Sequence, residues 1–142
     1  MGFYGEYKCA SDAKGRLFVP AKLRDAFGEE NEVILVRSLD TCVSLYPKSI
    51  WHTFEEKIYE LPMTDSLAIR RFFFGSAQDA ELDAQGRLQI PQNLREYAGI
   101  TKALVAVGCG DHVEIWDEKS YQDYSSVSRT AEVIELLRRH GL

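Results

Sequence analysis

The hydrophobic positions of this chain fall in short runs that predict strands, separated by residues that favour turns. Four such runs form two pairs, and each pair brackets a polar or glycine-containing stretch. Apolar runs of about four residues bounded by turn residues are typical of paired antiparallel strands. The runs are 33–36, 43–46, 103–106 and 113–116, and the turns between them are 38–41 and 108–111.

The pattern comes twice because the chain contains an internal repeat. Residues 12–28 align without gaps with residues 83–99, and nine of the seventeen aligned positions are identical. Each copy is predicted to be a strand, a tight turn, a return strand, a short helix and then the strand pair. A unit of about 45 residues is too small to close a good core alone. We therefore expect the two copies to interleave about a pseudo-twofold axis, with their turns presented as a related pair.

Glycine and proline mark the boundaries inside each copy. Gly15 and Gly86 can adopt positive φ in the tight turns, and the aspartate that opens each turn can cap it. A proline then suits the first position of each helix, and a glycine suits its end. These residues are Pro20 and Gly28 in the first copy and Pro91 and Gly99 in the second.

Helical periodicity follows each copy. Residues 47–60, 64–74 and 117–125 are predicted to form packing helices, whereas 128–142 is either a helix or a loosely held tail. The aromatic run 72–74 is interpreted as core or subunit interface rather than a base-stacking surface, because consecutive aromatics entering a strand must bury at least one face.

These elements predict an α+β fold that is mainly β. We divide the chain into a first repeat, a helical connector, a second repeat and a C-terminal helix with its tail. The boundaries are 5–48, 49–75, 77–118 and 119–142.

Bulk composition changes this picture little. A chain of 142 residues with 45% hydrophobic content can bury a core. No apolar stretch approaches the roughly 20 residues that a membrane span needs, and the N-terminus lacks the character of a signal peptide. We therefore expect a protein without a membrane partner that stays in the cytoplasm.

The residue types that carry catalysis or bind metals are scattered along the sequence. The cysteines form no short-spaced pair, so we interpret them as buried free thiols. The histidines lie outside any metal-spaced or nucleophile-bearing motif. We predict no enzyme activity, no catalytic site, no metal site and no cofactor. The residues concerned are Cys9, Cys42, Cys109, His52, His112 and His140.

The net charge of −5 argues against a simple nucleic-acid binder, because phosphate contacts need clustered Lys and Arg. The local charge is different. Residues 8–24 hold five basic side chains against Asp12 alone. The sequence therefore predicts one basic patch on an acidic body.

Several of these segments together resemble the MraZ family, in which a SpoVT-AbrB DNA-binding domain occurs twice in one chain. The resemblance covers nearly everything up to about residue 127. Two Asp-x-x-x-Arg motifs in this context make it specific, whereas one such motif alone would not. The segments that carry it are 3–7, 12–16, 19–22, 71–77 and 85–91.

The resemblance implies a fold and a function. The fold would consist of duplicated AbrB-like β-β-α-β-β halves interleaved into a pseudo-twofold barrel with flanking helices. The function would be that of a sequence-specific, nucleoid-associated transcriptional regulator in the bacterial cytoplasm. Its partner would be double-stranded DNA at promoter repeats ahead of the division and cell-wall gene cluster that includes its own gene. Assembly into a homo-oligomeric ring is also implied.

The motif residues carried over from the family are Asp12 and Arg16 in the first copy and Asp83 and Arg87 in the second. An arginine offers a planar fork of donors that suits phosphate or a guanine edge, and the aspartates would orient it. The DNA-binding candidates are Lys14, Arg16, Lys22, Arg24 and Arg87, and the turn-orienting candidates are Asp12, Gly15, Asp83 and Gly86.

The two copies differ in charge. Lys14 and Lys22 correspond to the neutral Gln85 and Asn93 in the second copy. We therefore expect the first repeat to carry most of the electrostatic attraction to DNA.

Two alternatives stay open at this stage. The Asp-Arg pairs could be surface ion pairs that only brace hairpins, each worth at most about 1 kcal/mol. The chain could also be an AbrB-like antitoxin or protein-binding module that holds a partner through the tail from residue 128 onward.

Overall fold

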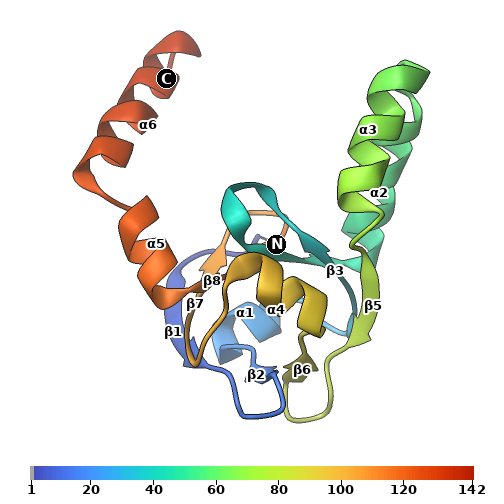
Figure 1. The fold of residues 1–142 in the computed structure, drawn as a ribbon, viewed down its shortest axis with the longest axis vertical. Helices are drawn as coiled ribbons and strands as arrows, with labels where there is room; N and C mark the ends of the chain where they lie inside the picture. The colour runs from blue at the N-terminus through green and yellow to red at the C-terminus, as the bar shows by residue number, and fades with distance from the viewer. Residues whose placement is uncertain (1) are drawn as a thin grey trace.

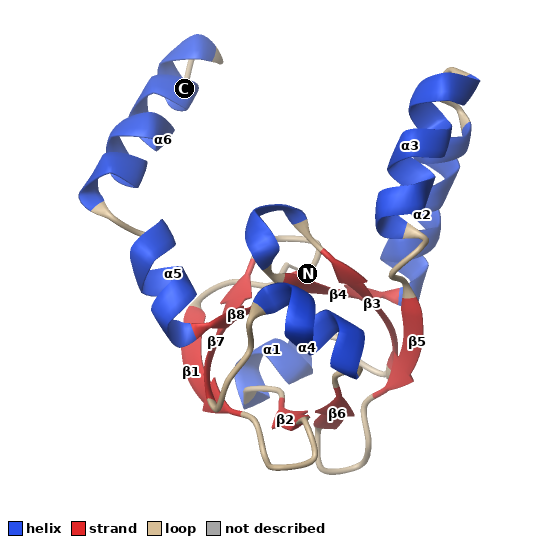
Figure 2. Ribbon diagram, in the orientation of Figure 1, coloured by secondary structure: helices blue, strands red, loops and turns tan. Residues whose placement is uncertain are grey.

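The computed structural model describes residues 2–142 as one six-stranded antiparallel sheet, a two-stranded ribbon and six α-helices (Figure 1; Figure 2). The expected α+β class is confirmed, but the expectation that the fold is mainly β is wrong, because the helices hold more residues than the strands. The strands are β1 Glu6–Ala10, β2 Arg16–Phe18, β3 Glu32–Arg37, β4 Val43–Pro47, β5 Gln78–Glu81, β6 Arg87–Gln89, β7 Ala103–Gly108 and β8 Val113–Asp117. The helices are α1 Ala21–Ala26, α2 Lys48–Tyr59, α3 Met63–Phe73, α4 Gln92–Ala98, α5 Glu118–Tyr124 and α6 Val127–Arg139, with a 3-10 turn at Leu39–Thr41.

The large sheet is built by strand exchange between the repeats. Its order is β1-β7-β8-β4-β3-β5, so the first strand of each copy pairs with the third strand of the other copy. Thus β1 lies against β7, and β5 lies against β3. The two hairpins meet in the middle, where β4 pairs with β8. Neither copy completes its part of the sheet alone, so the two copies form a single folding unit.

The ribbon joins the repeats a second time. Strand β2 pairs with β6, and Leu17 lies directly opposite Leu88. Beyond the strands, the N–H of Val19 donates to the carbonyl of Gly86 at 2.9 Å, and the N–H of Ile90 donates to the carbonyl of Gly15 at 3.1 Å. Each turn glycine is therefore held by the strand of the other repeat.

The main core fills the space between the sheet and the ribbon. Figure 2 shows the sheet curving around α1 and α4, with β2 and β6 at the open end. Burial of side chains from all of these layers is the dominant favourable term in folding. The largest fully buried side chains are Leu17, Leu23, Leu35, Leu45, Leu88, Ile90, Leu94, Leu104 and Ile115.

A second apolar cluster lies on the other face of the sheet, under the α2–α3 hairpin. Ile34, Val36 and Trp51 form its buried centre, and Phe73 and Phe74 pack against them. These phenylalanines end α3 instead of entering a strand, because β5 does not begin until Gln78. The assumed position of the aromatic run was therefore wrong, although its side chains do pack.

The helix boundaries follow the prolines and glycines, with one correction. Pro20 and Pro91 precede α1 and α4 instead of occupying their first positions, because both have an extended ψ, 139° and 150°. The glycines after the helices behave as expected. Gly28 has φ 64° and Gly99 has φ 61°, the left-handed conformation that ends many helices.

The C-terminal segment is helical, which settles the choice between a helix and a loose tail. Helix α6 has no buried residue, and Figure 1 shows it projecting from the body on the opposite side from the α2–α3 hairpin. Val127 at its start is 88% exposed, and four further apolar side chains are 43–49% exposed. They are Val133, Ile134, Leu136 and Leu137.

One arginine from each repeat packs against the turn of the other repeat. Arg24 of α1 donates from Nη1 to the carbonyl of Gln85 at 2.8 Å, and a Cβ on Gly86 would lie 2.6 Å from its Cδ. Arg95 of α4 packs against Gly15, with its Cζ 2.7 Å from a Cβ placed there, but its Nε donates to the carbonyl of Ile90 in its own repeat. Positive φ therefore favours glycine at both turns, and a Cβ at either position would also displace the arginine side chain that packs there.

Comparing Gly86→Ala with Gly28→Ala separates the effect of positive φ from the effect of the arginine contact. We expect Gly86→Ala to lower the free energy of unfolding by about 2–3 kcal/mol. The left-handed backbone contributes about 1–2 kcal/mol and loss of the Arg24 hydrogen bond about 1 kcal/mol. Gly28→Ala is the control, because φ is also positive there and no atom lies within 4 Å of the new Cβ. If urea denaturation gives the same decrease in the free energy of unfolding for both variants, the arginine contact does not stabilise the protein.

Candidate nucleic-acid interface

The first turn is organised by the side chain of Asp12. Its Oδ1 accepts hydrogen bonds from the backbone N–H groups of Lys14 and Arg16, both at 2.9 Å. Its Oδ2 accepts one from Nε of Arg16 at 2.8 Å. Gly15 has φ 77° and donates to the carbonyl of Asp12 at 3.0 Å. One carboxylate therefore caps the turn and fixes the arginine that follows it.

The second turn repeats this arrangement. Asp83 accepts from the N–H groups of Gln85 and Arg87 at 2.9 and 2.8 Å, and from Nε of Arg87 at 2.7 Å. Gly86 has φ 78°. The matching distances in the two turns differ by 0.1 Å or less, and Figure 1 shows the turns protruding next to each other at one end of the molecule.

The hydrogen bonds keep both carboxylates charged. The backbone N–H of Arg16, followed by its guanidinium, lowers the pKa of Asp12 below its usual range. Arg87 lowers the pKa of Asp83 in the same way. Within residues 2–142, Arg16 and Arg87 are paired only through Nε, and no hydrogen bond or ion pair involves their Nη atoms. Each aspartate thus orients an arginine whose terminal donors stay available to a ligand.

The ribbon presents these arginines on its outer face. Successive residues of a strand point to opposite faces, so the burial of Leu17 and Leu88 directs their neighbours outward. Arg16 lies opposite Gln89, and Phe18 lies opposite Arg87. Phe18 is 55% exposed, which is unusual for a phenylalanine.

Sequence reasoning missed Phe18 and Gln89 as members of this surface. The signal was present, because each stands two residues from a motif arginine across a buried leucine. The side chain of Gln89 also links β6 to the first turn, since its Nε2 donates to the carbonyl of Lys14 at 2.7 Å.

The remaining candidates lie at different depths. Lys14 is exposed at the first turn, and Lys22 is exposed at the start of α1. Arg24 is half-buried and holds the second turn through Gln85. Arg95, its counterpart on the first turn, was not among the predicted site residues, although the repeat aligns it with Arg24.

The described residues contain one group that could hold a metal ion, and it lies away from the turns. Cys109, His112 and Glu114 come together at the β7–β8 hairpin. Cys42 is buried as expected, but Cys9 is only partly buried and Cys109 is exposed. The expected burial fails for Cys109 because it lies in the hairpin turn, beyond the end of β7.

Comparison with known proteins places the chain in a family. The family described as "MraZ protein, putative antitoxin-like" matches residues 3–70 and, a second time, residues 73–139. The "Transcriptional regulator MraZ" of Acetivibrio thermocellus is 46% identical over 125 residues, which cover 87% of this chain and 86% of that protein. The protein of the same name from Clostridium beijerinckii is also 46% identical over 125 residues, covering 87% of each chain.

The structural comparison is more distant. The solution structure of PHS018 from Pyrococcus horikoshii matches with a TM-score of 0.37 and 18% identity, covering 79% of this chain and 95% of that chain. A likeness at this level carries no argument about fold or function. No helix among residues 2–142 is long and apolar enough to cross a membrane. The sequence matches decide the assignment, and by them the chain belongs to the MraZ family.

Proposed function

We propose that this protein is a DNA-binding transcriptional regulator that reads duplex DNA with the β2–β6 ribbon and its two turns. Relatives that share 46% identity over most of their length are named transcriptional regulators. The observation that carries the proposal is the pair of equivalent turns, each with an arginine held at Nε by an aspartate and free at its Nη atoms. The AbrB-like character of the two halves belongs to the same proposal.

The ribbon suits the major groove of DNA. This groove is about 12 Å wide and admits a two-stranded β-ribbon. Arg16 and Arg87 would donate from their Nη atoms to guanine O6 and N7 or to phosphate. Lys14 and Lys22 would contact phosphates, which position the protein without specifying the sequence. Arg24 contributes by holding the second turn, and the aspartates and turn glycines contribute by shaping the loops.

The two turns would not contribute equally. Lys14 and Lys22 are exposed in the first repeat, whereas Gln85 and Asn93 stand at the same positions in the second. The first repeat would therefore supply most of the attraction to phosphate, because that attraction depends on the number of cations that contact the backbone.

Assembly would supply the affinity that one subunit lacks. We propose a homo-oligomeric ring that places several turn pairs on successive promoter repeats, ahead of the division and cell-wall gene cluster that includes the protein's own gene. Linked binding events raise affinity without new contacts. Action on such promoters also implies a cytoplasmic location at the nucleoid.

A second candidate function is antitoxin-like binding of a protein partner. The family description includes the words "putative antitoxin-like", and α6 carries exposed apolar side chains with no buried residue. An exposed apolar stripe on a helix is the kind of surface that docks into a partner's groove.

The arginine of each turn is the first residue to test. Arg16→Ala should weaken binding to the promoter upstream of the protein's own gene by roughly 5- to 150-fold, since one bidentate base contact is worth about 1–3 kcal/mol. Arg87→Ala should have a smaller effect, because fewer cations support the second turn. Arg71→Ala is the matched control, as Arg71 is exposed on α3. Electrophoretic mobility shift measures binding, and circular dichroism with sedimentation monitors folding and assembly. Wild-type binding by both turn variants would mean that these arginines only brace hairpins.

Salt dependence tests the contribution of assembly. The slope of log affinity against log salt concentration is about −0.9 for each phosphate neutralised on duplex DNA. A ring should give a steeper slope than the few basic residues of one subunit allow, measured by fluorescence anisotropy on a duplex with several repeats. A slope no steeper than one subunit can produce would contradict binding through several turn pairs.

Deletion of residues 128–142 separates the two candidate functions. Because α6 buries no residue, the shortened protein should keep its unfolding midpoint, its oligomeric mass and its promoter affinity. Affinity purification of both forms from the native bacterium checks for a partner. A specific protein that is recovered with the full chain and lost with the deletion would favour the antitoxin-like function.

A further inference from the structure

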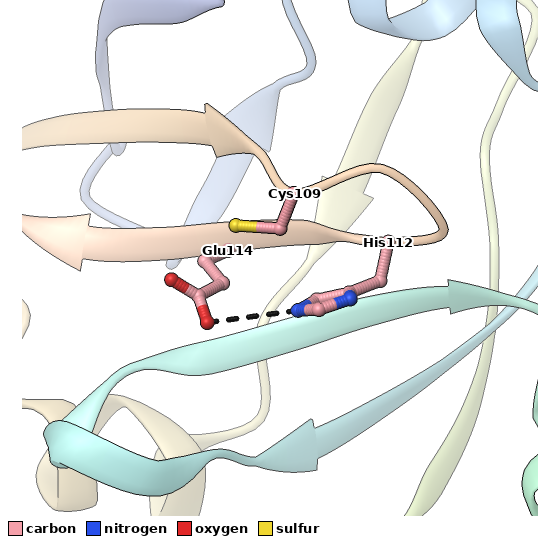
Figure 3. Close-up of side chains that lie close together, drawn as sticks. All are labelled: Cys109, His112 and Glu114. Carbon is pink, nitrogen blue, oxygen red and sulfur yellow. Dashed lines mark ion pairs between the residues drawn. The ribbon is translucent and has the colours of Figure 1, made fainter. Parts of the chain in front are cut away.

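Three potential metal ligands meet at the β7–β8 hairpin, and neither the fold nor the proposed DNA contact uses them. Figure 3 shows Cys109, His112 and Glu114 on one side of the hairpin. Their ligand atoms all lie within 4.8 Å of one another, and His112 Nε2 is 3.6 Å from Glu114 Oε2. Ligand atoms around a tetrahedral zinc ion are roughly 3.5 Å apart. Small side-chain rotations would therefore complete such a site.

The hairpin holds this spacing firmly. The N–H of Cys109 donates to the carbonyl of His112 at 2.9 Å, and Gly110 between them has φ 86°. The N-terminal segment binds the tip from outside, because Phe3 and Gly110 exchange two backbone hydrogen bonds of 2.8 and 2.9 Å. A ligand set on such a turn needs little ordering before it binds an ion.

The neighbouring side chains orient two of the ligands. Asp111 Oδ1 lies 2.8 Å from His112 Nδ1, which leaves Nε2 facing Glu114. Trp116 donates from Nε1 to Glu114 Oε1 at 3.0 Å, which leaves Oε2 facing His112. The ring of Tyr46 stacks on the imidazole with centroids 4.7 Å apart. Metal-binding histidines usually have such a carboxylate on the second ring nitrogen.

The site is open on one side. His112 and Glu114 line a groove of about 600 Å³ that also contacts Tyr46 and Phe54. Ser44 lies opposite Glu114 in the β4–β8 pair, so both side chains point to the same face of the sheet. The hydroxyl of Ser44 is buried without a hydrogen-bond partner among the described residues. A water molecule on a bound ion could enter by the groove as the fourth ligand.

We propose that Cys109, His112 and Glu114 bind one Zn²⁺ ion per chain, contrary to the expectation of no metal from the scattered residues. Thiolate, imidazole and carboxylate are all zinc ligands. The first repeat carries Leu39, Cys42 and Ser44 at the aligned positions, so it cannot form a second site of this kind. The site is separate from the turns, so it stands or falls independently of DNA binding.

Binding would release the thiol proton. Only the thiolate form of cysteine is a metal ligand, so the thiol of Cys109 must lose its proton as the ion binds. The ion takes the place of that proton on the sulfur. It also takes the place of the direct contact between His112 and Glu114, because both side chains then bind the ion.

Isothermal titration calorimetry of the full-length, chelator-treated protein with ZnCl₂ tests the site. We expect one ion per chain, and a weakening of more than roughly tenfold for Cys109→Ser and for His112→Gln. The matched controls are Cys9→Ser and His52→Gln, because Cys9 lies on β1 and His52 pairs with Glu55 without a cysteine. Co²⁺ titration adds a readout of sulfur ligation, since a thiolate–cobalt bond gives a charge-transfer absorption that Cys109→Ser should remove. Thermal unfolding without metal checks that each variant folds.

Two results would overturn the proposal. One is the absence of a one-to-one zinc isotherm with the folded wild-type protein. The other is wild-type zinc affinity in both folded site variants, which would place any bound zinc elsewhere in the chain.

Discussion

The sheet, the ribbon and the main core all depend on strand pairing between the two repeats. The first strand of each copy pairs with the third strand of the other copy, and β2 pairs with β6. The same pairing helps to build the core, because Leu17 and Leu88 are opposite each other in the ribbon and both side chains are buried. A copy of about 45 residues could not bury enough apolar surface alone. The exchange also brings the two turns to one end of the protein.

In each turn, one aspartate makes the contacts that shape the loop and also orients the arginine that we propose to contact DNA. Asp12 and Asp83 bind backbone N–H groups with one oxygen and an arginine Nε with the other. The brace that we considered as an alternative to DNA contact is therefore real. It leaves the Nη atoms of Arg16 and Arg87 unpaired among the described residues, so the brace and the proposed DNA contact are compatible.

Local features of the fold were predictable, and contacts between distant segments were not. The repeat, the glycines with positive φ and the strand pairs follow from residue types and spacing. The hydrogen bond from Arg24 to the carbonyl of Gln85 joins residues 61 positions apart. No pattern in the sequence around either residue indicates it. Cys109, His112 and Glu114 lie close in sequence, yet only the strand geometry shows that their side chains share one face. The exposure of Phe18 follows from the alternation of side chains along a strand, because its neighbour Leu17 is buried. It was therefore predictable from the sequence.

Hydrogen–deuterium exchange of the assembled protein, with and without promoter DNA, tests the central claim most directly. The ribbon and turns should become protected on DNA binding, so peptides covering 12–18 and 83–89 should exchange more slowly, with the larger change in the first. The β7–β8 hairpin and α6 should exchange at unchanged rates. Protection confined to α6 or to the α2–α3 hairpin, with the turns unaffected, would contradict the account.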